Sequence, residues 1–220
     1  MEKRLVLTRL REVGIIPVVR VESGEQAIAV AEVIREAGIP ILEITLTVTD
    51  AVKVIEKLST RYGDDVLIGA GTVLDHKTAN ACIDAGAQFV VSPVLNLRTI
   101  ELCKDRSVAV FPGALTPTEV FSAWEAGADA VKIFPCSAVG GAGYLRTLKA
   151  PLPHINLIPT GGVSLSTASD LIAAGAMALG VGSELINMEA IKAGDFETVA
   201  VTARSFVAAI YQVRSTEVIK

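Results

Sequence analysis

The sequence predicts an α/β fold, a (β/α)8 TIM barrel with an additional N-terminal helix, in a single domain over residues 1–220. Eight apolar runs begin near residues 15, 40, 66, 88, 108, 130, 155 and 177. Successive runs start about 20 to 26 residues apart, which accommodates one strand, one helix and two short loops. The runs are apolar at nearly every position, as is typical of parallel strands covered by helices. An open doubly wound sheet is the alternative, but IIPVVRVESGEQ lacks the G-x-G-x-x-G expected after its first strand.

Helices are expected between these strands. Residues 3–13 are predicted to form the extra helix, and residues 195–213 the last outer helix. After the first strand, a helical period places four apolar side chains on one face, and Thr116 with Glu119 forms a capping box for a later helix. The four side chains are Ala27, Val30, Ala31 and Ile34. Four helices are expected to end at a left-handed glycine, namely Gly38, Gly86, Gly127 and Gly175.

Composition excludes several classes of function. Apolar residues make up 51% of the chain and charged residues 20%, which argues against disorder. The net charge of −4 argues against nucleic-acid binding and against attachment to anionic lipid. The mean hydropathy is high at +0.51, yet no apolar run reaches the roughly 18 residues of a membrane helix, and MEKRLVLTRL does not resemble a signal peptide. We therefore expect a cytoplasmic protein in which Cys82, Cys103 and Cys136 are reduced thiols.

Charged residues within the apolar runs indicate where chemistry takes place. In the second run, Leu42, Ile44, Leu46 and Val48 alternate with Ile41, Glu43, Thr45 and Thr47. Because the apolar set belongs under the helices, Glu43 is predicted to face the barrel interior. The same argument directs Lys132 and Phe134 inward from the sixth run, and Arg20 ends the first run.

Two interpretations of Glu43 and Lys132 stay open on this evidence. In the first interpretation they form a structural ion pair, because buried charges are often paired. Alternatively, burial favours the neutral amine, which is a nucleophile, and the carboxylate moves protons for Schiff-base chemistry on a carbonyl.

Two glycine turns predict a phosphate site. Residues 160–164 (TGGVS) and 180–183 (GVGS) follow the seventh and eighth strands and lead toward helices. Barrels bind phosphate at these positions through backbone N–H groups and helix N-termini, so no basic side chain is needed.

At these residues the chain resembles the 2-keto-3-deoxy-6-phosphogluconate (KDPG) aldolases, which also cleave 4-hydroxy-2-oxoglutarate (KHG). The resemblance covers nearly the whole chain, in order and with matching spacing. It is carried by LEITLT at 42–47, GAGTVL at 69–74, VSP at 91–93, VKIFP at 131–135, IPTGGV at 158–163 and GVGS at 180–183.

This resemblance implies a class I aldolase, a lyase that acts on small 2-keto acids and phosphorylated sugar acids, without a metal or other cofactor and usually as a homotrimer. It makes Lys132 the Schiff-base lysine and Glu43 the general acid/base. Thr72 and Pro93 would line the pyruvyl pocket, and Phe134 would pack beside the lysine. Thr160 would contact the substrate hydroxyls, and Gly161, Gly162, Gly182 and Ser183 would hold the phosphate.

The chain departs from the family pattern at one candidate substrate-binding position. Many members have an arginine four residues after the glutamate, where it contacts the substrate carboxylate, and this chain has Thr47. We expect Arg20 to supply that charge, although pairing with Glu43 or Glu22 is an equal alternative. Galactonate-type relatives tend to lack a threonine at the position of Thr160, so its presence favours the gluconate epimer.

Two other functions stay open from the sequence. One is a phosphate-binding barrel isomerase or synthase that uses lysine as a general acid. The other is a non-catalytic barrel in which Glu43 and Lys132 are an ion pair. The sequence argues against a metal-dependent aldolase, because His76 and His154 are the only histidines and the ligands would have to be largely carboxylates.

Overall fold

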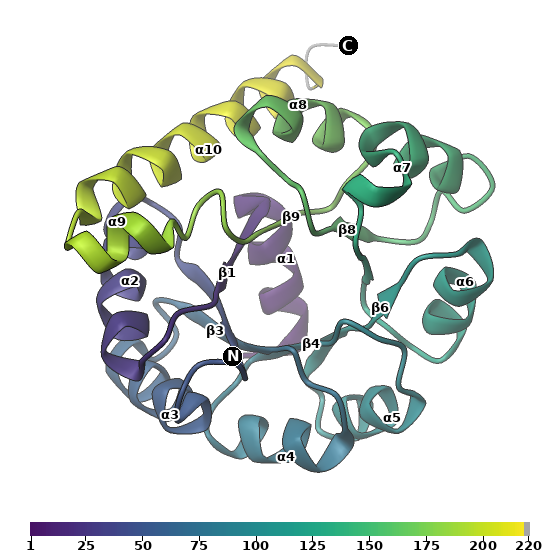
Figure 1. Ribbon diagram of the computed structural model, residues 1–220. Coiled ribbons are helices and arrows are strands. Elements are labelled where there is room, and N and C mark those ends of the chain that lie inside the picture. Colours follow the sequence, from purple (N-terminus) through teal and green to yellow (C-terminus); the bar gives the residue numbers. More distant parts are fainter. Residues whose placement is uncertain (218–220) are drawn as a thin grey trace.

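A computed structural model shows a curled sheet of parallel strands surrounded by helices (Figure 1). The structure describes residues 1–217, with side chains described for residues 1–215. Within this part of the chain the strands form two sheets, of order β5-β4-β3-β2-β1-β9 and β6-β7-β8. The strands are β1 (Ile15–Val19), β2 (Ile41–Thr45), β3 (Leu67–Gly71), β4 (Phe89–Val91), β5 (Ala109–Phe111), β6 (Gly113–Ala114), β7 (Val131–Ile133), β8 (Leu157–Pro159) and β9 (Leu179–Val181).

The expected single strand near residue 108 is two short strands, which corrects the predicted count of eight. Pro112 separates β5 from β6, and proline has no backbone N–H to donate to a neighbouring strand. The segment still joins the two sheets, because β5 pairs with β4 and β6 pairs with β7. On the other side, the isolated bridges Leu157↔Ala176 and Thr160↔Gly180 link the β8 region to the β9 region.

Helices cover the outside of the sheet, as the alternating pattern predicts. The expected face of α2 is buried, and Gly38, Gly86, Gly127 and Gly175 all have positive φ angles. The helices are α1 (Lys3–Val13), α2 (Gly24–Glu36), α3 (Ala51–Tyr62), α4 (His76–Asp84), α5 (Leu97–Asp105), α6 (Pro117–Glu125), α7 (Gly141–Lys149), α8 (Leu165–Ala173), α9 (Met188–Ala193) and α10 (Phe196–Glu217). Neither α9 nor the 3-10 turn η1 (Ser137–Val139) was predicted from the sequence.

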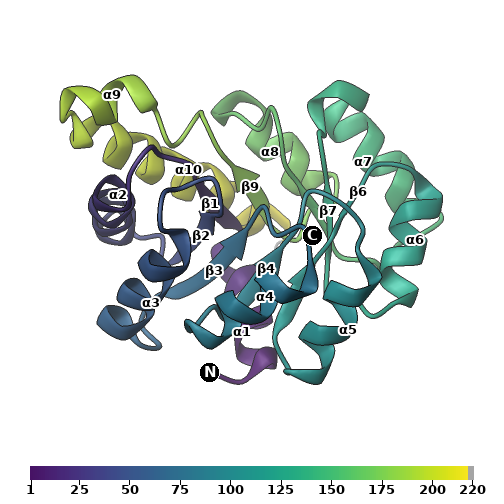
Figure 2. The same ribbon diagram turned by 60° about the horizontal axis from the view of Figure 1, so that its bottom comes forward.

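The extra helix α1 lies beneath the sheet (Figure 2). It leads directly into β1 through Gly14, whose carbonyl accepts a hydrogen bond from Leu179 N–H at the start of β9. Lys3 forms a 2.8 Å salt bridge with Asp129, which precedes β7. The helix therefore covers the amino-terminal end of the strands and leaves the carboxyl end open. Among the described helices, none has both the length and the apolar character needed to span a membrane.

Candidate active site

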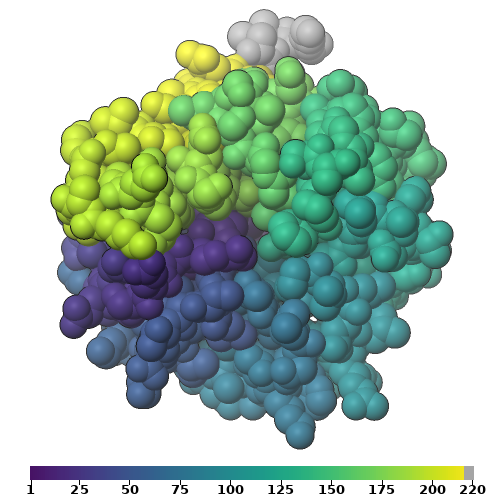
Figure 3. Space-filling view, viewed as in Figure 1, coloured from purple at the N-terminus to yellow at the C-terminus, as the bar shows by residue number. Residues whose placement is uncertain are grey.

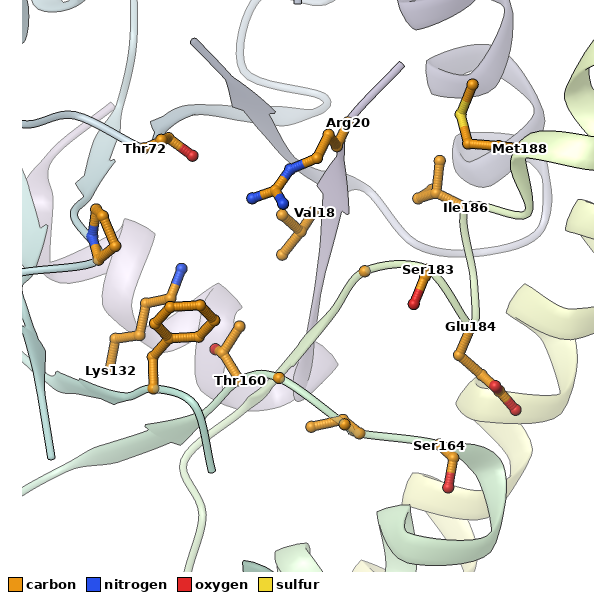
Figure 4. A pocket seen from close by; sticks show the side chains of 16 residues that line it. Val18, Arg20, Thr72, Lys132, Thr160, Ser164, Ser183, Glu184, Ile186 and Met188 are labelled. Atoms are coloured by element: carbon orange, nitrogen blue, oxygen red, sulfur yellow. The ribbon is translucent and has the colours of Figure 1, made fainter. Parts of the chain in front are cut away.

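A pocket of about 520 Å³ opens at the carboxyl ends of the strands. Segments from the N-terminal part of the chain, in purple, and from the C-terminal part, in green, meet in the middle of this face (Figure 3). Figure 4 shows side chains from opposite ends of the sequence around the pocket. Its lining comprises Val18, Arg20, Thr72, Pro93, Lys132, Phe134, Thr160, Gly161, Gly162, Val163, Ser164, Gly182, Ser183, Glu184, Ile186 and Met188.

Glu43 lies in the interior of the curled sheet, as parity predicts. It occupies the middle of β2, pairs in register with Val18 of β1 and Gly69 of β3, and is only 2% exposed. Burial raises the pKa of Glu43, while the positive charges of Lys132 and Arg20 partly oppose that shift. In the described residues its Oε1 atom has no hydrogen-bond partner. Such a carboxyl is suited to exchanging a proton with a bound molecule or a water.

The space for this carboxyl is provided by Gly71 at the end of β3. A methyl group on Gly71 would overlap the Glu43 side chain, including Oε1 and the carboxyl carbon. The absence of a side chain at position 71 therefore fixes where the Glu43 carboxyl lies. No role was predicted for this glycine of GAGTVL, because its importance depends on the register between the neighbouring strands β2 and β3.

Lys132 enters the pocket from β7. Its side chain is 6% exposed, and its Nζ lies 5.3 Å from the centre of the Phe134 ring, within the range of a cation–π contact. Phe134 follows the last residue of β7, lines the pocket and is 37% exposed. Gly161, with φ 87°, lets the ring pack closely, because a Cβ there would lie 3.3 Å from two ring atoms.

Glu43 and Lys132 do not form the structural ion pair that the sequence left open. Within the described part of the chain, neither side chain has a salt-bridge or hydrogen-bond partner. They are nevertheless close enough for the lysine charge to lower the pKa of Glu43. The structure thus places a buried amine and a buried carboxyl near one another, and neither group forms a salt bridge between strands.

Arg20 is exposed and begins the loop after β1. Its guanidinium points toward Thr72 and the Lys132 amine (Figure 4). Of the acids considered as partners, Glu22 pairs with Lys192 at 2.6 Å, and Arg20 has no ion pair among the described residues. Arg20 therefore presents an unpaired positive charge to the pocket.

Thr47 lies outside the pocket lining, because β2 ends at Thr45 and the strand alternation does not reach position 47. The Thr45 hydroxyl donates to the Val19 carbonyl at 3.0 Å, and the Thr47 hydroxyl lies 2.7 Å from Thr45 Oγ1. Because the Thr45 hydroxyl donates its proton to the Val19 carbonyl, the Thr47 hydroxyl is the donor in its hydrogen bond to Thr45 Oγ1. These two threonines hold the carbonyl that immediately precedes Arg20.

Thr72 and Pro93 line the pocket on the loops after β3 and β4. Thr72 has φ 59°, a left-handed conformation that is unfavourable for a β-branched residue. The neighbouring backbone holds it there, because Val73 N–H donates to the Val91 carbonyl and Leu46 N–H to the Gly71 carbonyl. Strain of this kind concentrates at functional sites, and it places Thr72 at the pocket wall.

The two glycine turns meet at the other side of the pocket. Gly161 and Gly162 both have positive φ angles and lead through the N-cap Ser164 into α8, while Gly182 and Ser183 follow β9. Among the described residues, no hydrogen bond to a protein acceptor is found for the backbone N–H groups of Gly162, Gly182 and Ser183. Free N–H groups beside a helix N-terminus are suited to binding an anion.

Val163 and Ser164 line the pocket as part of the predicted turn at 160–164. Four further lining residues were not predicted from the sequence: Val18, Glu184, Ile186 and Met188. Val18 was recognised only as part of an apolar strand. The last three lie on the connection between β9 and α9 or at the start of α9, an element that the sequence pattern did not reveal.

Comparison with known proteins identifies the family. The family model described as KDPG and KHG aldolase matches residues 6–202. The chain belongs to this family. A 2-dehydro-3-deoxy-phosphogluconate aldolase of Treponema pallidum is 35% identical over 88% of this chain and 92% of that protein. A 2-dehydro-3-deoxy-6-phosphogalactonate aldolase of Escherichia coli is 37% identical over 78% of this chain and 83% of that protein.

A solved structure connects this KDPG and KHG aldolase fold with covalent chemistry. It is the KDPG aldolase of Legionella pneumophila with pyruvate captured as a covalent carbinolamine intermediate. The two chains are 27% identical, with a TM-score of 0.84 over 91% of this chain and 97% of the other. No group of three or more His, Cys, Asp or Glu side chains with metal-site geometry occurs among the described residues of this family member.

Proposed function

We propose that this protein is a class I aldolase that cleaves KDPG to pyruvate and glyceraldehyde 3-phosphate. It also cleaves KHG to pyruvate and glyoxylate. The observation that carries the proposal is the buried amine of Lys132, which is unpaired among the described residues and reaches a pocket beside the buried carboxyl of Glu43. Family membership and the carbinolamine of the Legionella pneumophila enzyme support it.

The reaction begins when the neutral Lys132 amine attacks the C2 carbonyl of the substrate. Glu43 passes protons so that the carbinolamine loses water and becomes an iminium. Loss of the C4 hydroxyl proton then breaks the C3–C4 bond, whose electron pair moves into the iminium and leaves an enamine. Protonation at C3 and addition of water release pyruvate and restore Lys132. The lysine imine is the electron sink, so this mechanism requires no metal or other cofactor.

The two sides of the pocket suit the two halves of the substrate. Thr72, Pro93 and Phe134 surround Lys132 and would enclose the pyruvyl half. The N–H groups of Gly161, Gly162, Gly182 and Ser183, with the Ser183 hydroxyl, would bind the phosphate. Thr160 lies between these regions, is 7% exposed and would contact the substrate hydroxyls, which favours the gluconate epimer over the galactonate epimer.

Arg20 is proposed to bind the substrate carboxylate in place of the arginine that many members have at position 47. Its unpaired guanidinium points toward Lys132, where the carboxylate of a bound 2-keto acid would lie next to the reacting carbonyl. The bonds from Thr47 to Thr45 and from Thr45 to Val19 fix the strand end that carries Arg20. Thr47 therefore contributes to substrate binding through Arg20.

Replacing Arg20 with alanine should weaken the binding of pyruvate and the binding of KDPG together. A lost charge-assisted contact corresponds to about 1.5 to 3 kcal/mol, or roughly 10- to 100-fold in affinity. The pyruvate concentration needed for half-maximal borohydride trapping measures this loss. Adding Thr47→Arg to Arg20→Ala should restore part of it. Unchanged pyruvate dependence in Arg20→Ala would return Arg20 to a structural role.

Gly71→Ala should lower kcat by about 10²-fold, because the added methyl group displaces the Glu43 carboxyl from its position. The matched control is Gly143→Ala in α7, where nothing lies within 4 Å of the new methyl group and φ, as at Gly71, is not positive. Steady-state kinetics with KDPG would separate kcat from KM. Full activity in Gly71→Ala would mean that Glu43 tolerates displacement or that its position is unimportant.

The proposed reaction is tested by incubating the protein with pyruvate and borohydride and mapping the modified peptide by mass spectrometry. We expect one pyruvyl adduct, on Lys132. A phosphate-binding isomerase or synthase would bind phosphorylated sugars without trapping pyruvate, and a non-catalytic protein would show neither trapping nor KDPG cleavage. Assays with the gluconate and galactonate epimers would establish the substrate preference.

We also infer that the curled sheet is an eight-stranded (β/α)8 barrel in which residues 109–114 act as one strand. The bridges between the β8 and β9 regions support its closure. A homotrimer is proposed to form through exposed apolar side chains on the loops after β3 and β4 and at the start of α5, where Asn96 Nδ2 donates to the Leu74 carbonyl. These side chains are Leu74, Val94 and Leu97.

The buried free thiols of Cys82, Cys103 and Cys136 fit a cytoplasmic enzyme.

A further inference from the structure

Glu184 places a carboxylate at the side of the pocket where the glycine turns meet. It follows Ser183, is exposed, and is the only acidic residue among the described residues that line the pocket. The two basic lining residues, Arg20 and Lys132, lie on the other side (Figure 4). The Glu184 side chain is directed away from Arg20 and Lys132 and lies beside the start of α8, whose N-cap is Ser164 (Figure 4).

The backbone holds Glu184 in this place. On its C-terminal side, Leu185 N–H and Ile186 N–H both donate to the Gly182 carbonyl, at 3.0 and 2.8 Å. These two hydrogen bonds to one carbonyl close a tight turn that contains Ser183 and Glu184. In the described part of the chain, the Glu184 carboxylate has no salt-bridge or hydrogen-bond partner that would neutralise it.

We propose that Glu184 is a specificity-determining residue that lowers the preference of this enzyme for phosphorylated over unphosphorylated substrates. This inference rests on the proposed function, in which the turns at 160–164 and 180–183 bind phosphate. An unpaired carboxylate beside that site repels the phosphate of KDPG, which carries nearly two negative charges. The glyoxylate half of KHG carries a single carboxylate, which is attached to C4 and therefore lies nearer the reacting carbons, so Glu184 repels it less. The backbone N–H groups attract the phosphate, and Glu184 offsets part of that attraction.

Glu184→Gln keeps the size of the side chain and removes its charge. We expect its KM for KDPG to fall by roughly 3- to 10-fold, while kcat and the kinetics with KHG change little. Because the carboxylate is exposed to solvent, added salt should reduce the difference between the variant and the wild type. The matched control is Glu189→Gln, which removes an exposed carboxylate from the first turn of α9 outside the pocket lining.

A binding measurement separates this inference from the proposed reaction. Calorimetry with 3-phosphoglycerate, which needs no turnover, should show tighter binding to Glu184→Gln than to wild type or Glu189→Gln. Loss of pyruvate trapping on Lys132 in the wild type would overturn the proposed reaction but leave this comparison intact. Equal affinity of all three proteins, or an equal change for KDPG and KHG, would overturn the role of Glu184.

Discussion

Lys132→Ala is expected to lower the rate of KDPG cleavage by roughly 10⁴-fold or more and to abolish pyruvate trapping. The amine is the atom that forms the covalent bond, so no neighbouring group can replace it at the same position. The buried thiol of Cys136 is an unsuitable substitute, because burial raises its pKa and disfavours the nucleophilic thiolate.

The fold of this variant should survive. Lys132 has no salt-bridge or hydrogen-bond partner among the described residues, so its removal leaves no carboxylate that has lost a direct partner. Lys132→Met fills more of the vacated volume and should match Lys132→Ala in activity while equalling wild type in thermal stability. The control, Lys77→Ala, removes an exposed lysine from the first turn of α4 and should trap pyruvate normally. A pyruvyl adduct on another lysine would show that the nucleophile has been misassigned.

Much of the fold follows from local chemistry that the sequence displays. Left-handed glycines end helices at 38, 86, 127 and 175, and the Thr116–Glu119 capping box starts α6 as expected. The division of one expected strand into β5 and β6 was harder to predict from the sequence than the helix ends. Its cause is Pro112, which interrupts pairing at a single residue within an otherwise apolar run.

Strand parity predicted the site only as far as the strands extend. Glu43 and Lys132 lie inside β2 and β7, where alternation assigns each side chain to a face. Thr47 and Arg20 lie beyond strand ends, so alternation does not assign their directions. They depend instead on side-chain hydrogen bonds, such as the one from Thr45 to the Val19 carbonyl, 26 residues earlier in the sequence. The roles of Gly71 and Glu184 depend on the groups that lie next to them in the folded protein. These neighbours are distant in the sequence, so a single sequence does not reveal them.

Glu43→Gln is expected to lower kcat for KDPG by about 10² to 10⁴-fold, because the amide fills the same space but cannot accept or deliver a proton. Pyruvate should still bind, since Arg20 and the pocket wall are unchanged. Borohydride trapping should therefore persist at a reduced rate, which distinguishes a lost proton carrier from a lost binding site. Near wild-type kcat in this variant would remove Glu43 from the mechanism.

The same substitution should also change how stability depends on pH. Burial raises the pKa of Glu43 above its ordinary value of 4.5. In the wild type, the stability contributed by the protonated carboxyl is fully present below that ordinary value and is lost as pH rises through the folded-state pKa. The amide that Glu43→Gln introduces does not titrate, so the Tm of this variant relative to wild type should increase as pH rises above the ordinary value of 4.5.

A second carboxyl provides a control of opposite sign. Hydrogen bonds from Thr116 and from Leu115 N–H lower the pKa of Glu119, so its contribution to stability is lost as pH falls. Glu119→Gln should therefore be less stable than wild type at neutral pH and approach it in acid. If Glu43→Gln followed the Glu119→Gln trend, the Glu43 carboxyl would be stabilised as an anion in the folded protein. It would then be a poor proton donor at neutral pH, and its proposed part in dehydrating the carbinolamine would fail.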